Sequence, residues 1–261
     1  MKKTVQIANG IALVMTVVIN YLSNSGVFNG QTMATISAKY QNLFTPAGYA
    51  FSIWGLIYLG LLGFVVYCGP FAKATAIKEK ICLQVGWWFV ISCVVNCLWV
   101  LAWLYEYTFS TILLMLLLFV SLLFIIRNTN QVLEKSDSGT TIFFRVPFYI
   151  YSGWISVALI ANIAAYLKKI GWNGFGISET VWTILMFAVA ALLHVMMIWK
   201  RNMPVFAMVA VWALIAIAYA NYQLNYSVYI AAVITTVFIA VNIIVYFVQN
   251  LRISLNPKDR V

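Results

Sequence analysis

The chain has 261 residues, of which 64% are hydrophobic and 8% are charged, and its mean hydropathy is +0.94. In soluble domains about a quarter of the residues are charged, so this composition excludes an ordinary soluble protein. The net charge of +10 comes from Lys and Arg residues scattered over short loops, which argues against a nucleic-acid partner. The sequence therefore indicates an integral membrane protein with the lipid bilayer around it.

Long apolar runs predict an all-α, polytopic membrane bundle of about eight transmembrane helices. The expected helices are residues 7–27, 46–68, 81–104, 108–126, 146–167, 179–199, 204–222 and 226–249. The first run follows Lys2 and Lys3, as in a signal peptide, but no small-residue cleavage site follows it. We therefore expect it to be retained as a helix.

The positions of the basic residues predict the orientation, because Lys and Arg gather on the cytoplasmic side of membrane proteins. With the N-terminus inside, only Lys39, Lys168 and Lys169 of the 16 Lys and Arg residues fall on the outer side. We expect both termini to be cytoplasmic and the membrane to be the cytoplasmic membrane of a bacterium. A homodimer remains open as an assembly.

A glycine-rich segment, residues 170–178, marks the internal boundary. We expect residues 1–169 to form a five-helix membrane core and residues 170–261 to form a three-helix extension. Ser178 and Glu179 predict the start of the sixth helix, as its N-cap and its first-turn acid.

The second predicted helix carries a row of aromatic residues. Thr45 and Pro46 predict its start, because Thr caps helices and Pro suits their first turn. Phe51, Trp54 and Tyr58 follow at spacings of three and four, so they share one face. Such a row is either an interfacial belt or one wall of a site for a flat, apolar ligand.

Two further helices each carry an amide and aromatic residues on one face. These are Asn96, Trp99 and Trp103 in the third helix and Tyr151, Trp154 and Asn162 in the fifth. An amide at membrane depth needs a partner, because hydrocarbon offers none. Each amide therefore either joins two helices or meets a polar group of a ligand.

These residues resemble the three signature segments of the TspO/MBR family, which comprises the tryptophan-rich sensory proteins and the mitochondrial translocator protein. The second helix resembles the family through Pro46, Trp54 and Tyr58. The third does so through Asn96-Cys-Leu-Trp99, and the fifth through Tyr151-Ser-Gly-Trp154 followed by Asn162. The resemblance covers about residues 7–168, so the chain is identified as an extended member with extra C-terminal helices.

The resemblance implies a pocket in the five-helix bundle that binds porphyrins and other hydrophobic ligands, for sensing or transport. Indoles can stack on a tetrapyrrole, and Asn96 can meet a propionate. Porphyrin or haem would be the ligand, and no cofactor is required. With Phe51 from the aromatic face, the expected ligand-binding residues are Pro46, Phe51, Trp54, Tyr58, Asn96, Trp99, Tyr151, Trp154 and Asn162.

Two other functions stay open. One is a secondary transporter whose path involves helices six to eight, with His194 and Glu179. The other is a photochemical enzyme, because some members of the resembled family promote light-driven breakdown of porphyrins. We favour a binding protein over an enzyme, because the sequence has no Ser/His/Asp arrangement, paired carboxylates or phosphate loop and so offers no catalytic residues.

Three further features bear on ligands. His194, the one histidine, is either an axial haem ligand or a neutral imidazole bonded to a neighbouring helix, and we favour the second. The four cysteines follow no paired loop pattern, so we expect no metal site. Glu106 is expected to stand alone and solvated in the turn between the third and fourth helices.

Overall fold

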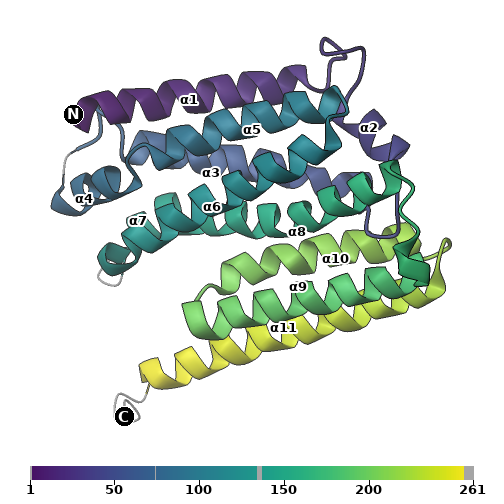
Figure 1. Cartoon of the computed structure of the whole chain (residues 1–261). Coiled ribbons are helices and arrows are strands. Elements are labelled where there is room, and N and C mark those ends of the chain that lie inside the picture. The colour runs from purple at the N-terminus through teal and green to yellow at the C-terminus, as the bar shows by residue number, and fades with distance from the viewer. Residues whose placement is uncertain (1, 74, 134–136, 256–261) are drawn as a thin grey trace. The chain divides into compact units, whose positions relative to one another are not determined.

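The computed structural model describes residues 2–73, 75–133 and 137–255, and within them every regular element is a helix (Figure 1). Seven of the described helices are long and apolar enough to cross a bilayer, counting the 3-10 turn Gly48–Ser52 with α3. They are α1 (Lys2–Leu22), α3 (Ile53–Tyr67), α6 (Thr108–Leu133), α8 (Val146–Lys169), α9 (Glu179–Arg201), α10 (Pro204–Asn221) and α11 (Tyr226–Leu255). The prediction of an all-α, polytopic membrane protein is confirmed.

The remaining predicted span is broken rather than continuous. Helices α4 (Ala76–Val85) and α5 (Trp88–Leu104) are together long and apolar enough to cross a bilayer, but they are bent by 47°. Gly86, at the break, has a φ of 51°, a left-handed conformation that cannot continue a right-handed helix. The span predicted over 81–104 is therefore present as two helices that break at this glycine.

The second span begins slightly later than predicted. Helical structure starts at Gly48 with a 3-10 turn, and α3 begins at Ile53, although Thr45 and Pro46 signal an earlier start. The N–H of Ala47 donates to the carbonyl of Ala216 at 3.1 Å. Bonds to a distant helix thus hold this segment outside α3, a case of tertiary structure overriding a local signal.

Two connecting segments contain short helices. The 28–45 segment folds into α2 (Met33–Lys39), which starts with a capping box between Thr32 and Thr35. On the 127–145 segment, α7 (Ser138–Thr140) and a π-helical turn (Thr141–Arg145) lead into α8. Asp137 caps α7 by accepting from the N–H of Thr140 at 2.8 Å. Of the basic residues expected on the cytoplasmic side, Lys135, Lys258 and Arg260 lie outside the described residues.

The chain divides into two compact units. The first is Met1–Asn42 with Phe51–Trp172, and the second is Leu43–Ala50 with Asn173–Val261. In the first unit α5 packs against α1 and α6, and α8 packs against α6 and α3. In the second unit α9, α10 and α11 pack against one another (Figure 1). The oxygen of Ser178 accepts from the N–H of Val181 at 3.4 Å, which confirms the predicted N-cap of α9.

Each unit has its own buried core. In the first unit the ring of Phe64 lies 5.1 Å from that of Phe148 and 5.2 Å from that of Phe89, which joins α3, α5 and α8. In the second unit Ala210 and Ala213 of α10 are fully buried. Small side chains let membrane helices approach closely, so α10 can pack against two helices at once.

Candidate functional site

The aromatic residues expected from the sequence gather around Trp54 in the first unit. The Trp54 ring lies 5.5 Å from Tyr58, 6.0 Å from Trp99, 5.9 Å from Tyr151 and 6.4 Å from Trp154. Centroid distances of 4.5–7 Å with stacked or edge-on rings are the favourable range for aromatic pairs. Three helices, α3, α5 and α8, thus meet at one indole.

Phe51 completes this group, because its ring meets Trp154 edge-on at 6.0 Å. We call Phe51, Trp54, Tyr58, Trp99, Tyr151 and Trp154 the Trp54 cluster. Its α8 members and Trp99 are buried, whereas Phe51 is 39% exposed and Trp54 and Tyr58 are partly exposed. The cluster therefore has a packed base on α5 and α8 and an accessible edge on α3.

Buried amides support the base of the cluster. Asn96 is fully buried, accepts from Asn20 Nδ2 at 2.8 Å and donates to the Tyr151 hydroxyl at 3.2 Å. Asn162 accepts from the Trp99 indole N–H at 3.1 Å. Both amides therefore join helices, the structural alternative offered by the sequence. The sequence analysis did not identify Asn20 as a partner of Asn96. Its position near the end of the first apolar run, where an amide needs a hydrogen-bond partner, could have indicated this role.

Two polar groups of the cluster remain without a hydrogen bond. Among the described residues, neither the buried indole N–H of Trp154 nor the buried hydroxyl of Tyr58 has a hydrogen-bond partner. Both side chains contact Trp54. A buried donor without an acceptor is costly, so the cluster has two donors that an acceptor on a bound molecule could satisfy.

Pro46 and His194 belong to the second unit, whereas the cluster belongs to the first. The inclusion of Pro46 among the ligand-binding residues stays a prediction. His194 is fully buried in α9, its Nδ1 is 2.7 Å from the carbonyl oxygen of Ala190, and its ring packs on Phe206 at 4.9 Å. Over the described part of the chain, no group of three or more His, Cys, Asp or Glu residues could hold a metal ion.

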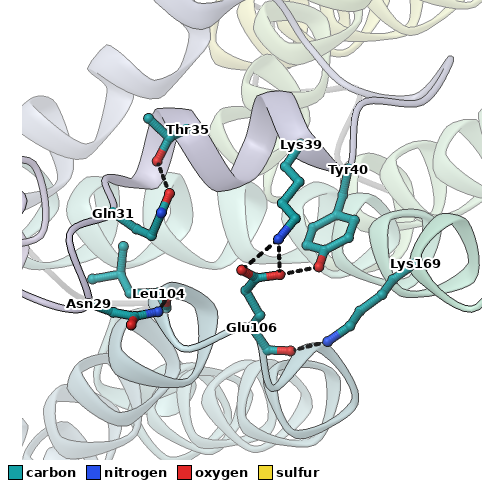
Figure 2. A network of polar contacts seen from close by, with 8 residues as sticks. All are labelled: Asn29, Gln31, Thr35, Lys39, Tyr40, Leu104, Glu106 and Lys169. Atoms are coloured by element: carbon teal, nitrogen blue, oxygen red, sulfur yellow. Dashed lines mark hydrogen bonds and ion pairs between the residues drawn. The ribbon is translucent and has the colours of Figure 1, made fainter.

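Glu106 is not the isolated, solvated residue that the sequence suggested. Its carboxylate forms an ion pair with Lys39 at 2.7 Å and accepts a hydrogen bond from the hydroxyl of Tyr40, while its backbone carbonyl accepts from Lys169 (Figure 2). Lys39 and Tyr40 end α2, Glu106 lies in the α5–α6 turn, and Lys169 ends α8. We call these four residues the Glu106 latch, since they fasten α2 to the end of the bundle.

Apolar contacts complete the docking of α2. Ile36, Tyr40, Trp103 and Ala165 form one buried cluster, with Met33 packed against it. Trp103 also donates its indole N–H to the carbonyl of Met33 at 3.5 Å. Because Trp103 lies one helical turn beyond Trp99 on the same face of α5, α2 covers the bundle end nearest to the Trp54 cluster.

The latch is expected to depend on pH. The hydrogen bonds from Lys39 and Tyr40 hold the pKa of Glu106 below its usual 4.5, and the Glu106 carboxylate raises the pKa of Lys39 above 10.5. A lowered carboxyl pKa adds stability above 4.5 that is lost as the pH falls through the folded-state value. The raised Lys39 pKa adds stability that is lost only as the pH rises above 10.5.

Hydrogen-exchange protection of residues 33–40, corrected for intrinsic rates, should therefore be high at neutral pH and fall below about pH 4.5. Glu106→Gln should lower this protection at neutral pH and remove its acid dependence. Asp137→Asn is the matched control, since Asp137 caps α7 and is not part of the latch. Equal protection in wild type and Glu106→Gln at every pH would contradict the latch.

The second unit contains a pocket that the sequence did not predict. It lies between α10 and α11, measures about 380 Å³ and is lined mainly by apolar atoms, with Tyr219, Tyr222 and Tyr229 among its residues. The rings of Tyr222 and Tyr229 meet edge-on at 5.2 Å. The grouping of these three tyrosines around the α10–α11 turn was the feature of the sequence that could have pointed to this pocket.

Comparison with known proteins gives a family but no individual relative. A family model described as TSPO-like protein matches residues 6–245. The matched range extends beyond residues 7–168, on which the resemblance in the sequence was argued, and includes α9, α10 and most of α11. No curated protein and no solved structure matches the chain.

Proposed function

Because the chain belongs to the TSPO-like protein family, we propose that its first unit binds a planar, hydrophobic ligand of the tetrapyrrole class against the Trp54 cluster. The observation that carries this proposal is the meeting of four aromatic side chains from three helices around one partly exposed indole. Indoles stack on large π-systems and bury much apolar area. The ligand in turn gains a flat apolar wall in a membrane protein.

The unsatisfied donors of the cluster favour a ligand with acceptor atoms. The Trp154 N–H and the Tyr58 hydroxyl are both buried without a partner within the described residues. A tetrapyrrole offers carboxylates and ring nitrogens, so binding can satisfy groups that are otherwise desolvated at a cost. A purely aliphatic ligand would leave that cost in place.

The membrane orientation follows the same proposal. Lys39 and Lys169 both reach Glu106, so two of the three basic residues assigned to the outer side lie at one end of the first unit. We propose that this end faces outward and that both termini are cytoplasmic, in keeping with the distribution of basic residues. The ligand would then approach the cluster near the covering helix α2.

A second candidate is light-driven breakdown of the bound porphyrin, with dioxygen as the oxidant. The observation that favours it is the close spacing of three indoles, since Trp54 lies 6.0 Å from Trp99 and 6.4 Å from Trp154. An indole beside an excited porphyrin is a competent electron donor.

Ion-coupled transport through α9–α11 has less support, because Glu179 accepts from the Leu43 N–H and His194 bonds within its own helix.

The test is a titration of the purified protein with protoporphyrin IX, in the dark and under illumination. We expect saturable quenching of Trp fluorescence and a shifted Soret band in the dark. Loss of the porphyrin spectrum under light would support the second candidate. His194→Ala, in the other unit, should keep the affinity within about threefold, or about 0.7 kcal/mol. Absence of saturable quenching by wild type would refute the proposed function.

A further inference from the structure

Residues 43–50 lie between α2 and α3 in the sequence, yet they belong to the second unit. We call them the strap. At its first residue, the N–H of Leu43 donates to Glu179 Oε1 at 3.0 Å, and the carbonyl of Leu43 accepts from Asn221 Nδ2 at 3.0 Å. Asn221 is 1% exposed. A buried amide from α10 and the first residue of α9 therefore fix the start of the strap.

The far end of the strap is fixed in the same way. Ala47 donates its N–H to the carbonyl of Ala216 at 3.1 Å. The carbonyl of Ala50, a fully buried residue, accepts from the indole N–H of Trp212 at 3.1 Å. Thus α10 bonds the strap at its start, middle and end.

Aromatic packing supports these bonds. Phe44 is 2% exposed, and its ring lies 5.6 Å from that of Phe187 in α9. Tyr49 meets Trp212 at 5.4 Å and Tyr219 at 6.1 Å, both in α10. The strap is therefore an integral part of the fold of the second unit, not a loose connection.

The strap leads directly into the residues of the Trp54 cluster. Ala50 is followed by Phe51, and Trp54 comes one helical turn later. Fixing the backbone of Ala50 limits where the first turn of α3 can begin, because consecutive Cα atoms are only about 3.8 Å apart. A strap released from α10 would give that turn the conformational freedom of an unbonded loop.

We propose that the three C-terminal helices act as an anchor for the ligand site, by holding the strap that sets the position of Phe51 and Trp54. In this role Trp212 and Asn221 are positioning residues, acting through the covalent chain. The inference rests on the proposed function for its effect on binding, whereas its effect on α3 can be measured without any ligand.

The chain offers a matched pair of variants for the test. Trp212→Phe removes the indole bond to Ala50 and keeps a ring against Tyr49. Trp199→Phe removes an equivalent indole bond, at 2.9 Å to Asn242, that does not involve the strap. The two tryptophans are similarly exposed, at 37% and 40%. Asn221→Ala is a second variant at the other end of the strap.

Two quantities are measured on each full-length variant, namely hydrogen exchange of residues 43–55 and the dissociation constant for protoporphyrin IX. We expect Trp212→Phe and Asn221→Ala each to speed exchange in the strap and the first turn of α3 by about fivefold, the worth of one hydrogen bond. The dissociation constant should rise about threefold or more. Trp199→Phe should change neither the exchange rate nor the dissociation constant. The two Trp→Phe variants should have similar midpoints of thermal unfolding.

Three results would overturn the anchor. They are unchanged exchange in Trp212→Phe, equal effects of Trp212→Phe and Trp199→Phe, and faster exchange with an unchanged dissociation constant. If wild type does not bind protoporphyrin IX, the proposed function fails. The exchange of Ile53–Gly55 then still decides the anchor, with faster exchange in Trp212→Phe supporting it and unchanged exchange refuting it.

Discussion

Trp54→Ala is expected to weaken protoporphyrin IX binding by about 1–3 kcal/mol, through lost stacking and lost apolar area. It should also destabilise the first unit, since four other rings use Trp54 as a common neighbour. Truncation of a buried Trp costs about 3–5 kcal/mol, and the partial exposure of Trp54 places its cost toward the lower end. The affinity and the unfolding midpoint are both to be measured, by fluorescence titration and by thermal unfolding.

Two further variants separate binding from packing. Trp54→Phe keeps a ring, so it should cost less affinity than alanine, and it should slow any light-driven degradation because phenyl is far harder to oxidise than indole. Trp87→Ala is the control, because Trp87 is 52% exposed and precedes α5. An interfacial belt predicts a lowered midpoint with unaltered affinity per folded molecule. Unaltered affinity in Trp54→Ala would therefore end the hypothesis of a ligand wall.

The second large effect is expected at Asn96. Asn96→Ala removes one acceptor of Asn20 Nδ2, which keeps its bond to the carbonyl of Thr16, and it removes the donor to the buried hydroxyl of Tyr151. A polar group left buried without a partner costs about 1–3 kcal/mol, so we expect a loss of about 1–3 kcal/mol in the free energy of unfolding, most of it from Tyr151. This exceeds the worth of an ordinary interhelical bond in a membrane, about 0.6 kcal/mol on average.

A double-mutant cycle tests the origin of that loss. Asn20→Ala and Asn96→Ala each break the same Asn20–Asn96 hydrogen bond, so the double variant should lose less than the sum of the single variants. Asn242→Ala is the control, because that amide accepts an indole bond but is not buried. Additive losses from Asn20→Ala and Asn96→Ala would show that the two side chains do not share a network.

The sequence allowed much of the first unit to be predicted. The three- and four-residue spacings of Phe51, Trp54 and Tyr58 place them on one face whatever the tertiary structure, because helical geometry fixes that relation. The pairing of Trp99 with Asn162 needed more than spacing, since it depends on how α5 and α8 pack. The family pattern predicted that those helices lie together, whereas the hydrogen-bond partner of each side chain is seen only in the structure.

Long-range polar contacts were the part that local reasoning could not reach. Glu106 sits in a turn where solvation is the usual outcome, and its ion pair with Lys39 joins residues 67 positions apart. Pro46 carries a strong local signal for a helix start, yet bonds from α10 hold its segment in the strap. In both cases the partner lies in another element, and no periodicity within one segment identifies it.

The interleaving of the two units also has a consequence for biosynthesis. Leu43 is translated 178 residues before Asn221, the side chain that bonds its carbonyl. A chain that has inserted only its first five spans therefore carries a strap whose polar backbone groups still lack their final partners. Domains that emerge early usually fold first. The strap is made early but gains its hydrogen-bond partners only when α9 and α10 have been made. Nascent chains that stall before α9 would lack both the ring that packs on Phe44 and the α10 groups that bond the strap backbone.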